Sequence, residues 1–184
     1  MTRFPCEKYA SLELNQVAFP KTGMVVSQVP LGTAFTAEAP CENGMWVVAD
    51  KAVGAINAPT ATINKPIGIV YTAEKEYGDI RTYGLKAFGR KIAGDYPRVG
   101  ILGLGDTVTT NCLQYDESTY ATFAALETAL NAIAATPMYV VPVTGSAVPQ
   151  LTTAKPGSGI YGKVVKYYTM PNGEKGIKYQ IVSL

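Results

Sequence analysis

The sequence predicts a mainly β protein of the α+β type. We expect a β-sandwich or β-barrel-like domain with one main α-helix, at about residues 117–135, and a C-terminal β-hairpin. Three observations lead to this fold class. Turn-forming residues are frequent, with 18 glycines and 12 prolines in 184 residues. Short apolar runs alternate with turn signals along most of the chain, and a single long segment has helical periodicity.

The domain organisation follows from the change in pattern near Gly23. Residues 1–22 contain Pro5 and Pro20 and have no sustained period, so we expect an extended N-terminal arm. Deletion of residues 1–18 is expected to leave the fold intact. Residues 23–184 then form a single β-rich domain. A polar connector rich in Pro, Gly and Thr, residues 144–158, could mark a subdomain break.

Within this domain, the first strands lie on either side of Asn43-Gly44, a pair that tolerates positive φ and predicts a hairpin. Trp46, the only tryptophan, begins the following strand and is expected to anchor the core. Residues 52–68 have the composition of a loop, and residues 67–79 that of another strand. Glycine every few residues over 80–108 favours short strands and bends.

The helix is predicted from apolar side chains that recur at steps of three and four residues. These are Tyr120, Phe123, Leu126, Leu130 and Ile133. Asp116 is the expected N-cap, and Pro137 stops the helix.

The chain closes with a strand over 138–143 and the C-terminal hairpin. In the hairpin, the strands over 161–170 and 177–184 flank Pro171-Asn172-Gly173. Strict alternation would place Val164, Lys166 and Tyr168 on one face of the first strand.

Several kinds of catalytic site are excluded by composition. The chain has no histidine, so Ser-His-Asp catalysis, Cys-His catalysis and histidine-ligated zinc are impossible within one chain. Cys6, Cys41 and Cys112 are widely spaced and form no C-x-x-C pair, so we expect reduced, mostly buried thiols.

Carboxylates are the remaining catalytic candidates. Glu74, Glu76 and Asp79 lie close in sequence, which keeps a small carboxylate-based hydrolase as an alternative. Lys75 and a turn signal interrupt this group, so we interpret it as a solvated strand end. We therefore expect no catalytic residue, no cofactor and no metal.

Two glycine motifs have the spacing of phosphate-binding loops. Gly157, Gly159 and Gly162 form G-x-G-x-x-G, but a β-hairpin is predicted after them where a dinucleotide site needs a helix N-terminus. Residues 100–107 match the P-loop spacing, yet Asp106 occupies the lysine position and its carboxylate would repel phosphate. We interpret both motifs as backbone features.

Charge is distributed unevenly along the chain. Residues 1–150 carry 11 basic and 13 acidic side chains, whereas residues 151–184 carry five lysines and one glutamate. A basic terminal segment can dock on an acidic surface, or it can be a solvated strand pair with lysines for solubility. A second basic and aromatic stretch, residues 81–98, raises nucleic-acid binding, which the total net charge of +2 disfavours.

No membrane segment is expected. The longest uncharged run, residues 128–154, is interrupted by Pro137, Pro142 and Pro149, and residues 1–14 lack the apolar core of a secretory signal. The sequence thus predicts a soluble protein.

Residues 23–56 resemble β-rich structural proteins of tailed-bacteriophage virions, most of all head (capsid) decoration or auxiliary proteins. The resemblance is carried by the strand-like "NGMWVVAD" at residues 43–50, and it covers about residues 15–75. It implies a virion protein that stabilises a capsid shell, with the major capsid protein or another virion protein as partner. It also implies a homo-oligomer, expected to be a trimer about a local three-fold axis; a tail-tube or other virion β protein is the alternative.

The same resemblance gives the arm and the basic C-terminal segment the role of contact surfaces. The expected interface residues are Arg3, Phe4, Tyr9, Lys163, Lys166 and Lys178.

Overall fold

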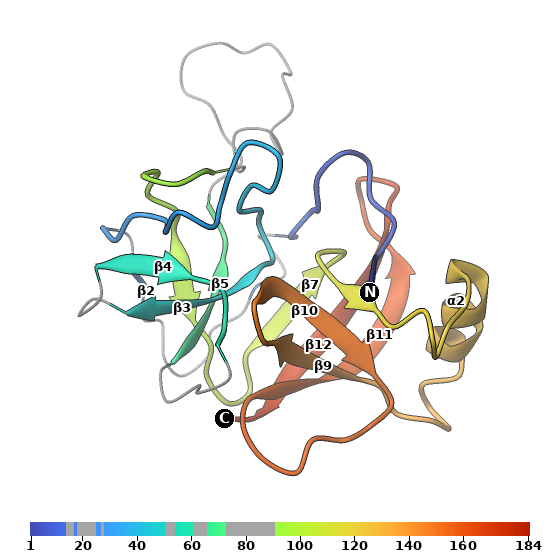
Figure 1. Ribbon diagram of the computed structural model, residues 1–184. Coiled ribbons are helices and arrows are strands. Elements are labelled where there is room, and N and C mark those ends of the chain that lie inside the picture. Colours follow the sequence, from blue (N-terminus) through green and yellow to red (C-terminus); the bar gives the residue numbers. More distant parts are fainter. Residues whose placement is uncertain (14–16, 18–24, 27, 51–53, 61–65, 73–90) are drawn as a thin grey trace.

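The computed structural model describes residues 1–13, 17, 25–26, 28–50, 54–60, 66–72 and 91–184. In this part of the chain the protein is mainly β with one helix, and its curled sheets form a half-barrel (Figure 1). The predicted fold class is confirmed. A seven-stranded sheet and a five-stranded sheet pack against each other.

The larger sheet has the strand order β1-β8-β10-β9-β11-β12-β7. Its pairings are antiparallel except that of β10 with β8, which is parallel. The bounds of its strands are β1 Thr2–Arg3, β7 Thr107–Thr110, β8 Gln114–Tyr115, β9 Tyr139–Val143, β10 Ser146–Thr152, β11 Tyr161–Thr169 and β12 Lys175–Ser183.

The smaller sheet has the order β2-β6-β5-β3-β4, and all its pairings are antiparallel. Its strands are β2 Val25–Val26, β3 Trp46–Asp50, β4 Ala55–Asn57, β5 Ile67–Val70 and β6 Val99–Ile101. Residues 55–57 are therefore a strand within the segment that the sequence predicted to be a loop.

Residues 46–48 of β3 and strand β5 are buried on both faces of the smaller sheet. Trp46 and Ile69 belong to the core between the two sheets, whereas Val47 and Val70 belong to a second core on the opposite face. This matches the period of two along a strand, which sends alternate side chains to opposite faces. The predicted role of Trp46 is confirmed: its side chain is fully buried, and its indole N–H donates to the hydroxyl of Tyr179 on β12 at 2.9 Å.

Residues 2–13 of the expected N-terminal arm, which we call the strap, pair and pack with the rest of the chain. The strap runs antiparallel to residues 109–115, which we call the acceptor edge. Thr2 and Arg3 pair with Tyr115 and Gln114, and Leu12 forms a bridge with Thr110. Residues 14–16 and 18–22 of the predicted arm lie outside the described residues.

Apolar strap residues explain why this segment is part of the fold. Phe4 is 1% exposed and, with Leu12, belongs to the core between the sheets, whereas Ala10 belongs to the second core. The Phe4 ring packs edge-on against the ring of Phe123, with centroids 5.0 Å apart. Removing the strap would take buried side chains out of both cores, so we expect its deletion to destabilise the fold.

Helix α2, Phe123–Asn131, is shorter than the predicted helix. Its N-cap is Thr122, whose hydroxyl accepts the N–H of Ala125, rather than Asp116. The Asp116 side chain instead accepts the N–H of Ser118 in a separate turn. At the other end the helix stops at Asn131, and residues 132–135 form tight turns before Pro137.

Three other expectations concern turns. The C-terminal hairpin of β11 and β12 is confirmed. The connector over 144–158 is not a break, since β10 occupies residues 146–152 inside the larger sheet and pairs with β9 and β8. Asn43 and Gly44 do form a turn, with φ of 92° at Gly44, but no strand over residues 33–40 pairs with β3, so the predicted hairpin is wrong there.

We predict that Phe4→Ala lowers the free energy of unfolding by about 3–4 kcal/mol, because it empties a buried site that the structure fills with an aromatic ring. Urea denaturation followed by tryptophan fluorescence measures this change. The matched control is Tyr96→Ala, because Tyr96 is 62% exposed; its effect should stay within about 0.5 kcal/mol. A similarly small loss for Phe4→Ala would mean that the strap does not pack as described.

Candidate protein-binding surface

The hairpin of β11 and β12 gathers the three lysines that the sequence singled out, Lys163, Lys166 and Lys178. Lys166 lies directly opposite Lys178 in the strand register, and Lys163 lies opposite Gln180. Because positions 178 and 180 are two residues apart on one strand, both pairs are on the same face of the hairpin. The structure therefore places the three lysines on one surface.

A β-bulge adds an apolar residue to this surface. The register of β11 shifts between Val164 and Lys166, so Val165 is the extra residue and its side chain is 55% exposed. Val164 is buried in the core, and the bulge explains why it does not share a face with Lys166 as strict alternation predicted. We call Lys163, Val165, Lys166 and Lys178 the basic face.

Aromatic and acidic neighbours fix the position of the basic face. The Lys166 ammonium lies over the Tyr168 ring, 5.2 Å from its centroid, in a cation–π contact. The Tyr168 hydroxyl donates to a Glu13 carboxylate oxygen at 3.0 Å. Burial raises the pKa of Tyr168, so the phenol stays neutral and remains a donor at physiological pH.

Lys175 belongs to the opposite side of the hairpin. Its ammonium lies 3.7 Å from a Glu127 carboxylate oxygen on α2 and 5.5 Å from the centroid of the Tyr167 ring. The Tyr167 hydroxyl donates to the same carboxylate at 2.7 Å. The charge of Lys175 therefore helps to hold the helix against the sheet and does not contribute to the basic face.

The expected interface residues of the arm have other positions. Arg3 on β1 forms an ion pair with Glu42, with 3.1 Å between Nη2 and Oε2. Phe4 lies in the core and is not available to a partner. Tyr9 is half-buried, with the Lys8 ammonium 5.4 Å from the centroid of its ring. The structure does not bring these residues together with the basic face.

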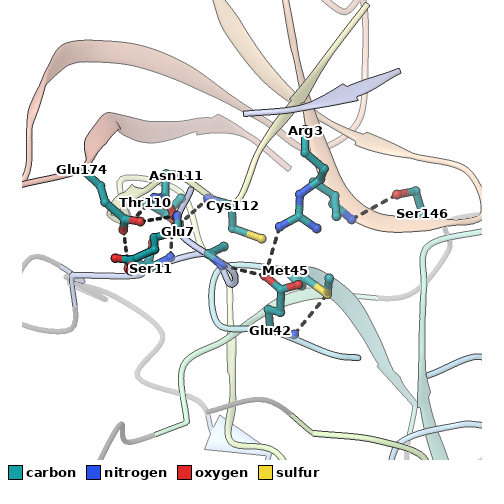
Figure 2. Close-up of polar contacts among 12 residues, drawn as sticks. Arg3, Glu7, Ser11, Glu42, Met45, Thr110, Asn111, Cys112, Ser146 and Glu174 are labelled. Carbon is teal, nitrogen blue, oxygen red and sulfur yellow. Dashed lines mark hydrogen bonds and ion pairs between the residues drawn. The ribbon is translucent and has the colours of Figure 1, made fainter. Parts of the chain in front are cut away.

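A polar latch, which sequence reasoning missed, connects the strap to the hairpin turn (Figure 2). One oxygen of the Glu174 carboxylate accepts the N–H of Glu7 at 2.6 Å. The other oxygen accepts from the side chains of Ser11, Asn111 and Asn172 at 3.0, 3.1 and 2.8 Å. The strap, the acceptor edge and the hairpin turn thus share one carboxylate. Glu174 is the single acidic residue in a basic segment, which was the only signal for it in the sequence.

A second polar contact lies on the other side of the strap. Glu42 accepts both from Arg3 and from the backbone N–H of Ala10, at 2.7 Å. Figure 2 shows the Arg3 guanidinium pointing toward the Glu42 carboxylate, beside Cys112. Two strap residues are therefore tied to one carboxylate on the segment that leads into β3.

None of the three cysteines forms a disulfide, and Cys41 and Cys112 are buried. Burial raises the pKa of Cys112 to about 12 and raises that of Cys41 as well, so both stay protonated at neutral pH. Protonated, buried thiols are poor nucleophiles and poor metal ligands. Among the described residues, no group of three or more His, Cys, Asp or Glu side chains could hold a metal ion.

Both glycine motifs have backbone roles where the structure describes them. The first leads into β11, and a Cβ at Gly162 would lie 2.7 Å from the Tyr179 ring, so the close approach of the two strands requires glycine there. In the second, the buried Asp106 carboxylate accepts the N–H of Gly103 at 2.6 Å. Burial raises the pKa of Asp106, whose side chain closes a turn.

Other sequence candidates fall partly outside the described residues. The candidate carboxylates Glu74, Glu76 and Asp79 lie outside the described residues. So does most of the basic and aromatic stretch, namely Arg81, Tyr83, Lys86, Phe88 and Arg90. Of the described remainder, Arg98 donates from Nε to the Tyr71 hydroxyl at 2.9 Å.

No protein-family model, no curated protein and no solved structure matches the chain. Within the residues that the structure describes, none of the helices has the length and apolar character needed to cross a membrane.

We predict that Glu174→Ala lowers the free energy of unfolding by about 2–3 kcal/mol, because hydrogen bonds to a charged acceptor are lost at the strap. Glu174→Gln keeps one carbonyl oxygen and should lose less. The comparison is chemical denaturation of these variants and of Glu38→Ala, which removes a carboxylate at an exposed position. Equal stability of the Glu174→Ala and Glu38→Ala proteins would contradict a structural role for the latch.

Proposed function

We propose that the protein acts by binding, as a structural protein of a bacteriophage particle that attaches to the capsid shell and stabilises it. The observation that carries this proposal is the basic face: three lysines that are separated in sequence lie together around an exposed valine on one hairpin. A surface that combines positive charge with an apolar contact fits an acidic protein surface.

The hairpin is suited to such a contact because its opposite side is fixed. Ile177 and Tyr179 of β12 are fully buried in the core between the sheets. The strands behind the lysines therefore need little ordering when a partner binds, which lowers the entropic cost of association. Charge complementarity of this kind mainly raises the association rate and fixes the docking position.

The choice of partner rests on the resemblance of residues 15–75 to virion structural proteins. A protein that binds only the assembled shell shifts the equilibrium toward that shell by mass action. We propose the major capsid protein as the partner and the basic face as the docking surface.

The experiment is co-sedimentation of the purified protein with parent capsid shells at several salt concentrations. We predict that Lys163→Glu with Lys166→Glu weakens binding about tenfold or more at low salt, because two attractive contacts become repulsive. The matched control is Lys8→Glu with Lys155→Glu, which makes the same change in net charge at exposed lysines outside the hairpin. Binding by the control should remain close to that of the wild type.

Three results would contradict the proposal. Absence of wild-type binding to the shells would remove the capsid as the partner, and tube formation by the pure protein would favour a tail protein. Equal loss of binding in both double variants would mean that net charge matters and that the basic face does not.

A further inference from the structure

The contacts of the strap are those of a bound strand. Its backbone pairs with the acceptor edge near both ends: the N–H of Phe4 donates to the carbonyl of Leu113 at 2.8 Å, and the N–H of Glu13 donates to that of Thr109 at 3.0 Å. Between these bonds the N–H of Asn111 donates to the carbonyl of Ser11 at 3.2 Å. This is the pattern by which an added strand is recognised at the edge of a sheet.

Side chains make this recognition specific to the sequence of the strap. Phe4 and Leu12 enter the core on either side of the loop formed by residues 5–10. Arg3 pairs with Glu42, and Ser11 bonds to Glu174. The groups around the acceptor edge thus offer apolar sites for two strap side chains and a charged partner for two others.

We propose that the acceptor edge also takes the strap of a second copy of this chain, so that two copies exchange their straps. The hydrogen-bond and ion-pair partners described above for the strap, Glu42, Thr109, Asn111, Leu113 and Glu174, lie on the same chain, and a second copy carries an identical set. The exchanged pair therefore keeps each of these contacts, and exchange of an identical element is a low-cost route to a dimer. The chain's own strap competes at a high effective concentration, so exchange rises with protein concentration. This inference is independent of the capsid proposal.

The Arg3–Glu42 ion pair allows a direct test with full-length chains. Arg3→Glu alone places two carboxylates together, and Glu42→Arg alone places two guanidinium groups together. When the two variants are mixed, exchange restores an opposite-charge pair at both acceptor edges. We predict that the equimolar mixture forms a heterodimer, measured by size-exclusion chromatography with light scattering, at a concentration about tenfold or more below that at which either variant dimerises alone.

The matched control carries both substitutions on one chain. It restores the pair within that chain and should remain monomeric at the concentration at which the mixture dimerises. A mixture that stays monomeric, while circular dichroism shows both variants folded, would overturn the proposal. Dimerisation of the control to the same extent as the mixture would overturn it too.

A second measurement leaves the ion pair intact, in case the charge variants do not fold. The Thr2 hydroxyl donates to the Glu117 carboxylate, so the two positions lie in contact across the strap and the turn after β8. Full-length Thr2→Cys and Glu117→Cys chains, both with Cys6→Ser, are mixed at high concentration and oxidised with glutathione disulfide. If the straps exchange, the cysteine at position 2 of one chain lies next to the cysteine at position 117 of the other, so the fraction of disulfide-linked dimers that join the two variants should exceed the fraction expected from random pairing. A random share or less would overturn the proposal.

Discussion

The antiparallel pairing of the strap with the acceptor edge is the interaction on which the rest of the structure depends. The edge contains β7, the last strand in the order of the larger sheet, and β8, which lies near its beginning. Because the strap pairs beside both, it joins the two ends of a sheet that would otherwise be open, and unpaired edges are a liability in β proteins. Phe4 and Leu12 also fill the core between the sheets, and Ala10 contributes to the second core. One segment therefore contributes to closure of the sheet and to both cores.

The C-terminal hairpin connects this closure to the surface proposed for binding. Its inward side chains, among them Tyr179, hold the smaller sheet through the contact with Trp46. Its turn carries Glu174, which accepts hydrogen bonds from the strap, and its outward side carries the basic face. The proposed docking and the closure of the fold thus depend on the same two strands.

The sequence predicted the parts of this arrangement that depend on local pattern. The alternation of side chains and the Pro-Asn-Gly turn were sufficient to predict the C-terminal hairpin. The large apolar surface of Trp46 was sufficient to predict its place in the core. The strap was missed because its stability comes from partners about 100 residues away, and a proline-containing stretch with no period contains no local sign of them. The bulge at Val165 was missed for a related reason: one extra residue changes the phase of a strand without changing its composition. Helix α2 was predicted too long because Thr122 competes with Asp116 as the cap.

Amide hydrogen exchange under native conditions tests the closure by the strap most directly. If the strap is an integral strand, the amides of Phe4, Glu13 and Asn111 should exchange as slowly as that of Val164, which donates to the Met138 carbonyl within the larger sheet. All four would then open only with the global unfolding transition. If the strap amides exchange about 100-fold or more faster than that of Val164, the strap opens separately from the rest of the sheet. The free energy of that opening is then at least about 2.7 kcal/mol lower than the free energy of the opening that exposes Val164. Such a result would show that the sheet is stable without the strap and would contradict its central role.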